Sequence, residues 1–205
     1  MFKIILENTG KRYNREWIFK NVNLEFSQNN SYVVLGSNGS GKSTFLQTIA
    51  GNITSSSGIV SFYNAEEKIS DESIYKFISI ASPYLELIEE FSLIEMLQFH
   101  SKFKNFLLPV DEIIGLSGLE KSRDKQIKYF SSGMKQRVRL ILAILSDTPV
   151  LLLDEPISNL DRKAVDWYKE LMTQYSGNRI TFVCSNHQSD EYFLCKEKIN
   201  IEDYK

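Results

Sequence analysis

The chain has few residues of the kinds that cross-link a protein or bind metal through sulfur and imidazole. Of its 205 residues only two are cysteine and two are histidine. Cys184 and Cys195 lie too far apart for a CxxC motif, and neither belongs to a histidine cluster. We therefore interpret both as buried or idle thiols, and we exclude a thiol-ligated metal site and a CxxC redox motif.

Long hydrophobic runs are also missing. The longest apolar pieces resemble Leu140–Leu145, whereas a helix that spans a bilayer needs about 18 apolar residues in succession. The first residues, Met1–Leu6, lack the small-residue cleavage site of a secretory signal. The sequence therefore predicts a cytoplasmic location.

Neither sign of charge dominates. Lys and Arg number 24 and Asp and Glu number 26, which gives a net charge of −2. The one basic cluster, residues 121–128, is interrupted by Asp124, so no nucleic-acid footprint is present. With 42% apolar and 24% charged residues, the chain can bury the core of one ordinary globular domain, with or without a subdomain.

A glycine-rich loop is the most informative feature that is present. Residues 36–44 satisfy G-x-x-x-x-G-K-[ST] directly after the apolar run Tyr32–Leu35. Such a loop turns its N–H groups towards phosphates, and the positive end of the following helix faces the same anion. Lys42 would reach the β- and γ-phosphates, and the Ser43 hydroxyl would ligate Mg²⁺. The predicted nucleotide-binding residues here are Gly36, Ser37, Asn38, Gly39, Ser40, Gly41, Lys42, Ser43 and Thr44. A ligand-free Gly/Ser turn is the alternative, which the strand before the loop and the helix after it disfavour.

The periodicity predicts alternating strands and helices around this loop. Two strands at the start should form a hairpin with a polar turn at 10–15. Ser92 and Glu95 form a capping box, and Ser131 or Ser132 caps a long helix. Pro109 and residues 115–118 should break a mostly helical middle. The expected strands are 2–7, 17–26, 31–35, 59–62, 150–153 and 179–184, and the expected helices include 41–50, a long one ending near 146, and 162–175.

Two adjacent carboxylates follow the strand 150–153, which is apolar on both faces and should be central in a parallel sheet. In this arrangement Asp154 holds the Mg²⁺ shell, and Glu155 polarises the attacking water. Together with the phosphate loop, the pair indicates NTP hydrolysis, because phosphoryl transfer needs charge neutralisation and a positioned nucleophile.

The segment Phe130–Arg137 reads Phe-Ser-Ser-Gly-Met-Lys-Gln-Arg, and here the chain resembles the nucleotide-binding subunits of ATP-binding cassette (ABC) transporters over nearly its whole length. It resembles the family's Leu-Ser-Gly-Gly-Gln signature with three departures, at Phe130, Ser132 and Met134. On the residues alone, Ser-Ser-Gly before an apolar helix would be an N-cap. The resemblance implies a second anion site that acts on the γ-phosphate of a partner subunit. Its residues are Ser131, Ser132, Gly133 and Met134.

Further positions match the family in order and spacing. Tyr13 matches the aromatic on which adenine stacks; the alternative is a core tyrosine of the hairpin. Asp161, at the end of Ser158–Asp161, matches a loop that touches the opposing site. His187 matches the switch histidine that contacts the γ-phosphate and orients the catalytic carboxylate, Glu155. His100 has no evident partner, so we expect a surface or core role for it.

One family position is not filled. The glutamine that follows the strand at 78–81 in ABC subunits is replaced by Pro83, which has neither a side-chain oxygen nor an N–H. A Mg²⁺ ligand is therefore missing there, although Ser82 or Glu86 could supply an oxygen. Residues 83–90 could serve chiefly for docking.

The resemblance implies one α/β domain over residues 1–205. It would be a P-loop NTPase of ABC type, with an antiparallel N-terminal β-subdomain and a small helical subdomain at about 84–146. It implies an ATPase subunit, similar to short bacterial exporter ATPases, that binds ATP and Mg²⁺ and powers transport through ATP-dependent dimerisation. The implied partners are a second cassette, as homodimer or heterodimer, and an integral membrane permease, which would hold the subunit at the inner face of the membrane. The resemblance indicates neither the transported substrate nor the direction of transport.

Two alternatives stay open. A soluble ABC ATPase that acts on nucleic acid or ribosomes would usually carry two cassettes with a charged linker or a long coiled coil, and this chain shows neither. An ATP-binding regulatory module without hydrolysis would fit Pro83 and the altered signature. Glu155 and His187 argue against that second alternative.

Overall fold

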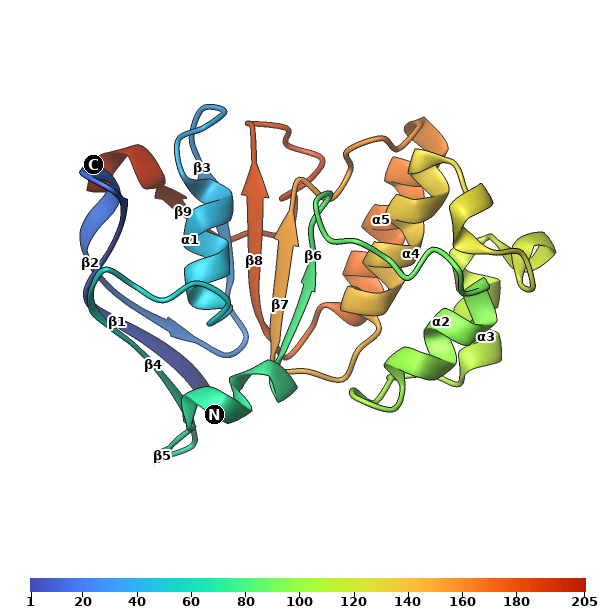
Figure 1. The fold of residues 1–205 in the computed structure, drawn as a ribbon, viewed down its shortest axis with the longest axis horizontal. Helices are drawn as coiled ribbons and strands as arrows, with labels where there is room; N and C mark the ends of the chain where they lie inside the picture. Colours follow the sequence, from blue (N-terminus) through green and yellow to red (C-terminus); the bar gives the residue numbers. More distant parts are fainter.

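The computed structural model describes residues 1–205 and contains two β-sheets with helices around them. A four-stranded antiparallel sheet has the order β2-β1-β4-β5, and a five-stranded sheet has the order β6-β7-β8-β3-β9. Helix α1 lies between the two sheets, whereas α4 and α5 lie beyond the other face of the five-stranded sheet (Figure 1). This is the predicted α/β architecture with an antiparallel N-terminal part.

The antiparallel sheet is built on a long hairpin. Its strands are β1 (Phe2–Tyr13), β2 (Glu16–Ser27), β4 (Ser57–Asn64) and β5 (Glu67–Lys68). The predicted hairpin is confirmed, but the predicted turn at 10–15 is wrong, because β1 continues to Tyr13, which pairs with Glu16. Register shifts between Leu6 and Arg12 absorb the polar stretch, and Asn14 turns the chain with a left-handed φ of 54°.

The five-stranded sheet is parallel throughout. Its strands are β3 (Ser31–Leu35), β6 (Ile78–Ala81), β7 (Val150–Asp154), β8 (Ile180–Ser185) and β9 (Glu197–Asn200). Strand β7 is buried along its whole length between β6 and β8, as predicted. Because the strands are parallel, the loops after β3, β6, β7 and β8 meet at one edge of the sheet, where ligands bind in open α/β folds.

The helices are α1 (Lys42–Ile49), α2 (Leu93–His100), α3 (Val110–Ser117), α4 (Ser132–Ile144) and α5 (Arg162–Tyr175). The capping box at Ser92 is confirmed, and Ser131 rather than Ser132 is the N-cap of α4. The predicted break at 115–118 is wrong in detail: Gly115 lies inside α3, which Pro109 and Gly118 bound. Residues 84–146 contain α2, α3 and α4.

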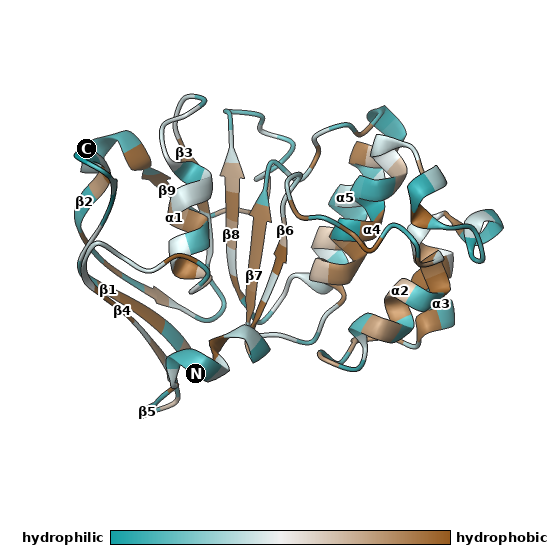
Figure 2. Cartoon of the chain, viewed as in Figure 1, coloured by the Kyte–Doolittle hydropathy of each residue, from teal (hydrophilic) through white to brown (hydrophobic).

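Two hydrophobic clusters lie on opposite faces of the parallel sheet. Leu152 of β7 joins the cluster shared with α1 and the antiparallel sheet, whereas Leu151 and Leu153 join the cluster shared with α2 to α5. Figure 2 shows the strands β6, β7 and β8 mostly in the brown of hydrophobic residues. Much of the loops at the top of the same view is in the teal of hydrophilic residues. None of the helices is both long enough and apolar enough to cross a bilayer.

His100 does have a partner, which corrects the prediction that it has none. Its Nε2 lies 2.8 Å from the Ser146 hydroxyl, and its ring stacks on Phe106. Burial lowers the pKa of His100 to about 4, so the ring is neutral. The cysteines are both free; Cys184 is buried, and burial raises the pKa of Cys195 to about 12. The prediction of buried or idle thiols is consistent with this.

Candidate nucleotide-binding site

The phosphate loop connects β3 to α1 and depends on glycine at a close approach of two segments. Gly41 has a left-handed φ of 109°, and a Cβ atom there would lie 2.3 Å from Cγ2 of Ile18 on β2. Only glycine therefore allows the hairpin to approach the start of α1 this closely. The predicted nucleotide-binding residues 36–44 are brought together in this turn.

Lys42 is held beneath the loop by three acceptors. Its ammonium donates to the carbonyl oxygens of Gly36 at 2.8 Å and Ser37 at 3.0 Å, and to Oδ1 of Asn186 at 2.6 Å. The amide of Asn186 in turn donates to the side-chain oxygen of Asn38 and, at 2.9 Å, to Oε1 of Glu155. Asn186 thus joins the predicted phosphate-binding lysine to the predicted catalytic carboxylate.

Asn186 is a site residue that the sequence does not predict. Its position directly before His187 was the only available signal. Asparagine is common at the ends of strands for reasons of turn geometry, so the residue type alone does not distinguish this role.

Asp154 lies at the buried end of β7, with 2% of its surface exposed. Its Oδ2 accepts a hydrogen bond from the Ser82 hydroxyl at 3.3 Å, and its Oδ1 has no partner. Burial raises the pKa of Asp154, while the nearby Ser43 hydroxyl acts in the opposite direction. One carboxylate with a free buried oxygen, next to serine hydroxyls, is a donor set that suits Mg²⁺.

The side chains of Ser82 and Glu86, which could each supply the oxygen that Pro83 lacks, lie in different surroundings. Ser82 is buried and contacts Asp154 directly, whereas Glu86 is exposed and lines a different pocket, with Lys135 and Arg139. The next residue, Tyr84, is 82% exposed. Ser82 is therefore the nearer substitute for the missing glutamine oxygen.

A cleft of about 380 Å³ lies at the phosphate loop. Its walls are formed by the phosphate loop, the start of α1, residue Ile18 of the hairpin and Glu155. The lining residues are Ile18, Asn38, Gly39, Gly41, Lys42, Ser43, Thr44, Tyr84 and Glu155.

Glu155 and His187 follow the neighbouring strands β7 and β8, and both have backbones in the left-handed region. Their φ angles are 45° and 63°. The N–H of Glu155 donates to the carbonyl of Cys184 at 3.0 Å, which ties the two strand ends together. Non-glycine residues keep such conformations only where the surroundings enforce them, and these positions cluster at functional sites.

A second pocket, of about 420 Å³, brings the Ser131–Met134 segment and Asp161 together. The Ser131 hydroxyl accepts from the Met134 N–H at 3.2 Å, and Asp161 accepts from the Ala164 N–H at 2.8 Å, so both cap helices. A Cβ atom on Gly133 would lie 3.0 Å from the Asn159 carbonyl. This pocket shares no lining residue with the phosphate-loop cleft.

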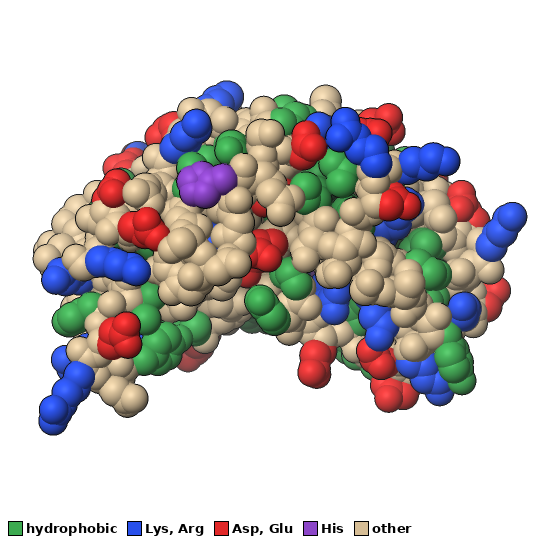
Figure 3. All heavy atoms as spheres, turned by 90° about the horizontal axis from the view of Figure 1, so that it is seen from above, with side chains coloured by type: hydrophobic (Ala, Val, Ile, Leu, Met, Phe, Trp, Pro, Cys, Tyr) green, Lys and Arg blue, Asp and Glu red, His purple; other side chains and the backbone are tan.

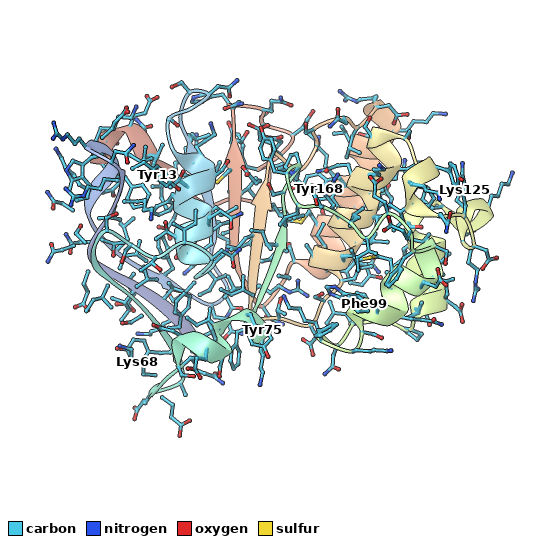
Figure 4. The ribbon with its side chains drawn as sticks, in the orientation of Figure 1. Tyr13, Lys68, Tyr75, Phe99, Lys125 and Tyr168 are labelled. Atoms are coloured by element: carbon cyan, nitrogen blue, oxygen red, sulfur yellow. The ribbon has the colours of Figure 1, made fainter.

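Tyr13 ends β1 and is 48% exposed. It lies near the top of the hairpin, to the left of α1 (Figure 4), and Lys11 Nζ lies 5.2 Å from the centre of its ring. A core role is therefore excluded. The ring is available for stacking, and its contact with adenine stays a prediction.

We expect Tyr13→Ala to weaken ATP binding several-fold to a hundredfold, because a base-stacking aromatic contributes about 1–3 kcal/mol. Tyr75, also exposed and lying at the lower edge of the molecule in Figure 4, away from Tyr13, provides the matched control Tyr75→Ala. Calorimetric titration with ATP measures both. An unchanged affinity in folded Tyr13→Ala would show that the ring makes no contact with the base.

Charges of both signs are interspersed over the edge that carries these loops (Figure 3). No basic stripe follows the surface in this view, so it offers no phosphate-backbone track of the kind that nucleic-acid-binding proteins use.

Comparisons with known proteins identify the family. A family model described as ABC transporter matches residues 19–158. The chain is 29% identical over 191 residues to the uncharacterized ABC transporter ATP-binding protein YybJ of Bacillus subtilis, which covers 92% of this chain and 87% of that protein. It is 28% identical over 192 residues to the lantibiotic transport ATP-binding protein SrtF of Streptococcus pyogenes, covering 89% and 79%.

Solved structures share the fold. A putative ABC transporter ATP-binding protein from Pyrococcus furiosus superposes with a TM-score of 0.81 at 17% identity, covering 99% of both chains. The dimeric bacterial ABC transporter cassette MJ0796 superposes with a TM-score of 0.79 at 23% identity, covering 97% of this chain and 94% of that one. This chain belongs to the ABC transporter family, as one of its ATP-binding subunits.

Proposed function

We propose that this ATPase subunit hydrolyses Mg·ATP at composite sites, each formed by the phosphate loop of one cassette and the Ser131–Met134 segment of another. The cycle of association and hydrolysis then drives a separate membrane permease. One observation carries the proposal: the phosphate-loop cleft and the signature pocket are both built on this chain but share no residue. A second cassette related by a two-fold axis can combine them.

The phosphate loop would bind and orient the nucleotide. The loop N–H groups and Lys42 would hold the β- and γ-phosphates, with Tyr13 against the base. Ser43 and Asp154 would hold Mg²⁺, and the free oxygen of Asp154 is the observation that fits the ion. When bound, Mg²⁺ neutralises the charge that develops on the phosphates.

Glu155 would polarise the water that attacks the γ-phosphate, and His187 would contact that phosphate. The hydrogen bond from Asn186 fixes one oxygen of Glu155, which leaves the other for the water. A positioned base contributes typically 10²–10⁴-fold to a rate. Ser131, Ser132, Gly133, Met134 and Asp161 of the second cassette would complete the site with helix N-termini aimed at the same phosphate.

The permease partner is supported by the relatives, one of which is a lantibiotic transport ATP-binding protein. Residues 83–99 would form the docking surface, with the exposed Tyr84 at its start. The subunit would then be peripheral on the inner face of the membrane. Because Pro83 has no side-chain oxygen to contribute, we expect docking of the permease to close the site and stimulate hydrolysis.

A complementation experiment tests the composite site. Lys42→Ala removes the phosphate contact, and Gly133→Asp places a carboxylate in the signature pocket, so each variant alone should be inactive. In an equal mixture, half of the dimers carry one intact site, so about a quarter of the wild-type rate should return if copies pair at random.

Gly177→Asp is the matched control, because a side chain at Gly177 meets no atom within 4 Å. That variant should hydrolyse ATP like the wild type and should give no gain when mixed with Lys42→Ala beyond its own activity. A mixture of Lys42→Ala and Gly133→Asp that stays inactive, although both chains are folded, would contradict the composite site.

A further inference from the structure

Asn186, the residue directly after strand β8, contacts both the phosphate loop and the loop after β7. Its Oδ1 accepts from the Lys42 ammonium at 2.6 Å. Its amide group donates to Oε1 of Glu155 at 2.9 Å and to the side-chain oxygen of Asn38. These contacts use the carbonyl oxygen and the N–H groups of the amide. The half-buried Asn186 side chain is therefore held by hydrogen bonds from several segments.

The chemistry of the partners allows one orientation of this amide. The Lys42 ammonium can only donate a hydrogen bond, and a carboxylate at Glu155 can only accept one. An amide carries an acceptor and a donor on neighbouring atoms, so it serves both groups at the same time. A carboxylate in its place would face Glu155 with like charge, and an apolar side chain would bond to neither group.

Backbone conformation does not explain why residue 186 is asparagine. Other asparagines of this chain, such as Asn14 and Asn159, have left-handed φ angles, which asparagine tolerates better than most residues. Asn186 is not among the residues with a positive φ. Its side-chain contacts are therefore the reason for the residue type.

The resemblance to the family gives the orientation of Glu155 to His187, but in this structure Asn186 makes the contact. The His187 side chain is exposed and makes no hydrogen bond with Glu155, whereas the Asn186 amide does. We propose that Asn186 is the positioning residue of Glu155, whose amide orients the carboxylate from the phosphate-loop lysine. His187 is then left to the γ-phosphate. The inference rests on the proposed function, in which Glu155 is the base.

Two substitutions at Asn186 test this role. Asn186→Ala removes the amide; a misplacement of about 1 Å can cost about a hundredfold in rate, and we expect turnover to fall at least about tenfold. ATP affinity should stay within about threefold of the wild type, because Lys42 keeps the carbonyls of Gly36 and Ser37. Asn186→Asp keeps the shape and the acceptor for Lys42 but replaces the donor with a negative charge, so its turnover should fall at least as far.

A double-mutant cycle shows whether Asn186 acts through Glu155. In the Glu155→Gln background the base is already lost, so the addition of Asn186→Ala should lower the residual turnover by no more than about twofold. A general effect on structure would instead repeat the tenfold loss. The measurements are phosphate release at saturating Mg·ATP, ATP affinity by calorimetry, and the thermal midpoint.

Asn64→Ala is the matched control, because Asn64 is an exposed asparagine at the end of β4 in the antiparallel sheet. It should keep the wild-type turnover and ATP affinity. Asn186→Asp has the shape of the wild-type side chain, so it decides the matter if Asn186→Ala does not fold.

Wild-type turnover in a folded Asn186→Ala or Asn186→Asp would overturn the inference. So would a second tenfold loss in the Glu155→Gln background, or a parallel loss of ATP affinity in Asn186→Ala. The inference and the proposed function fail differently. A wild-type chain without hydrolysis, alone or with its permease, contradicts the function, whereas an active chain indifferent to both substitutions contradicts only the positioning role.

Discussion

Glu155→Gln is expected to lower turnover by about 10²–10⁴-fold, the usual contribution of a positioned general base. Binding should survive, because glutamine keeps the side-chain carbonyl that accepts from Asn186 and leaves Lys42 and Asp154 unchanged. Since the dimer would be released only after hydrolysis, the variant should accumulate as a dimer in Mg·ATP. Phosphate release and light scattering measure the two effects.

Glu197→Gln is the control, because Glu197 is an exposed carboxylate on the edge strand β9. It should turn over ATP like the wild type and should not accumulate as a dimer. If Glu155→Gln stays monomeric at concentrations well above the Kd for nucleotide, ATP-dependent association of this chain with itself is contradicted. If it hydrolyses ATP at the wild-type rate, Glu155 is not the base.

Lys42→Ala is expected to abolish measurable ATP binding. A hydrogen bond to a charged group is worth about 1.5–3 kcal/mol, and loss of the phosphate contacts should weaken affinity by about a hundredfold or more. The substitution also removes the donor that joins the Gly36 and Ser37 carbonyls to Asn186, so the thermal midpoint should fall.

Calorimetry with ATP and a thermal melt measure the two consequences separately. Lys68→Ala, an exposed lysine at the far end of the antiparallel sheet (Figure 4), should change neither. Retention of wild-type affinity in folded Lys42→Ala would show that the loop amides alone bind the phosphates.

Local signals explain most of what could be predicted from the sequence. The bounds of β3 and α5 are confirmed as predicted, because a short apolar run and a capped amphipathic stripe are properties of neighbouring residues. The loop at 36–41 and the pair Asp154 and Glu155 were found for the same reason. Their motifs are contiguous, so no tertiary contact is needed to recognise them.

The features that the sequence does not predict depend on contacts between segments far apart in the chain. Strand β9 is exposed at three of its positions, and only Ile199 is buried, so it has no apolar pattern. It exists because β3 offers a free edge for parallel pairing. Asn186 was missed as a site residue for a similar reason. Its contacts with Lys42, Asn38 and Glu155 join segments that are far apart in the sequence.

Strand β7 belongs to both hydrophobic clusters, with alternate side chains on each face of the sheet. Asp154, the predicted Mg²⁺ ligand, ends this strand, and Glu155, the predicted catalytic carboxylate, follows it. We therefore expect a displacement of α4 to shift β7 and, with it, Asp154 and Glu155 at its end. The same displacement is resisted on the opposite face by α1 and the antiparallel sheet. The proposed reaction centre therefore lies at the end of a strand that packs against the helices α2 to α5 on one face and against α1 and the antiparallel sheet on the other.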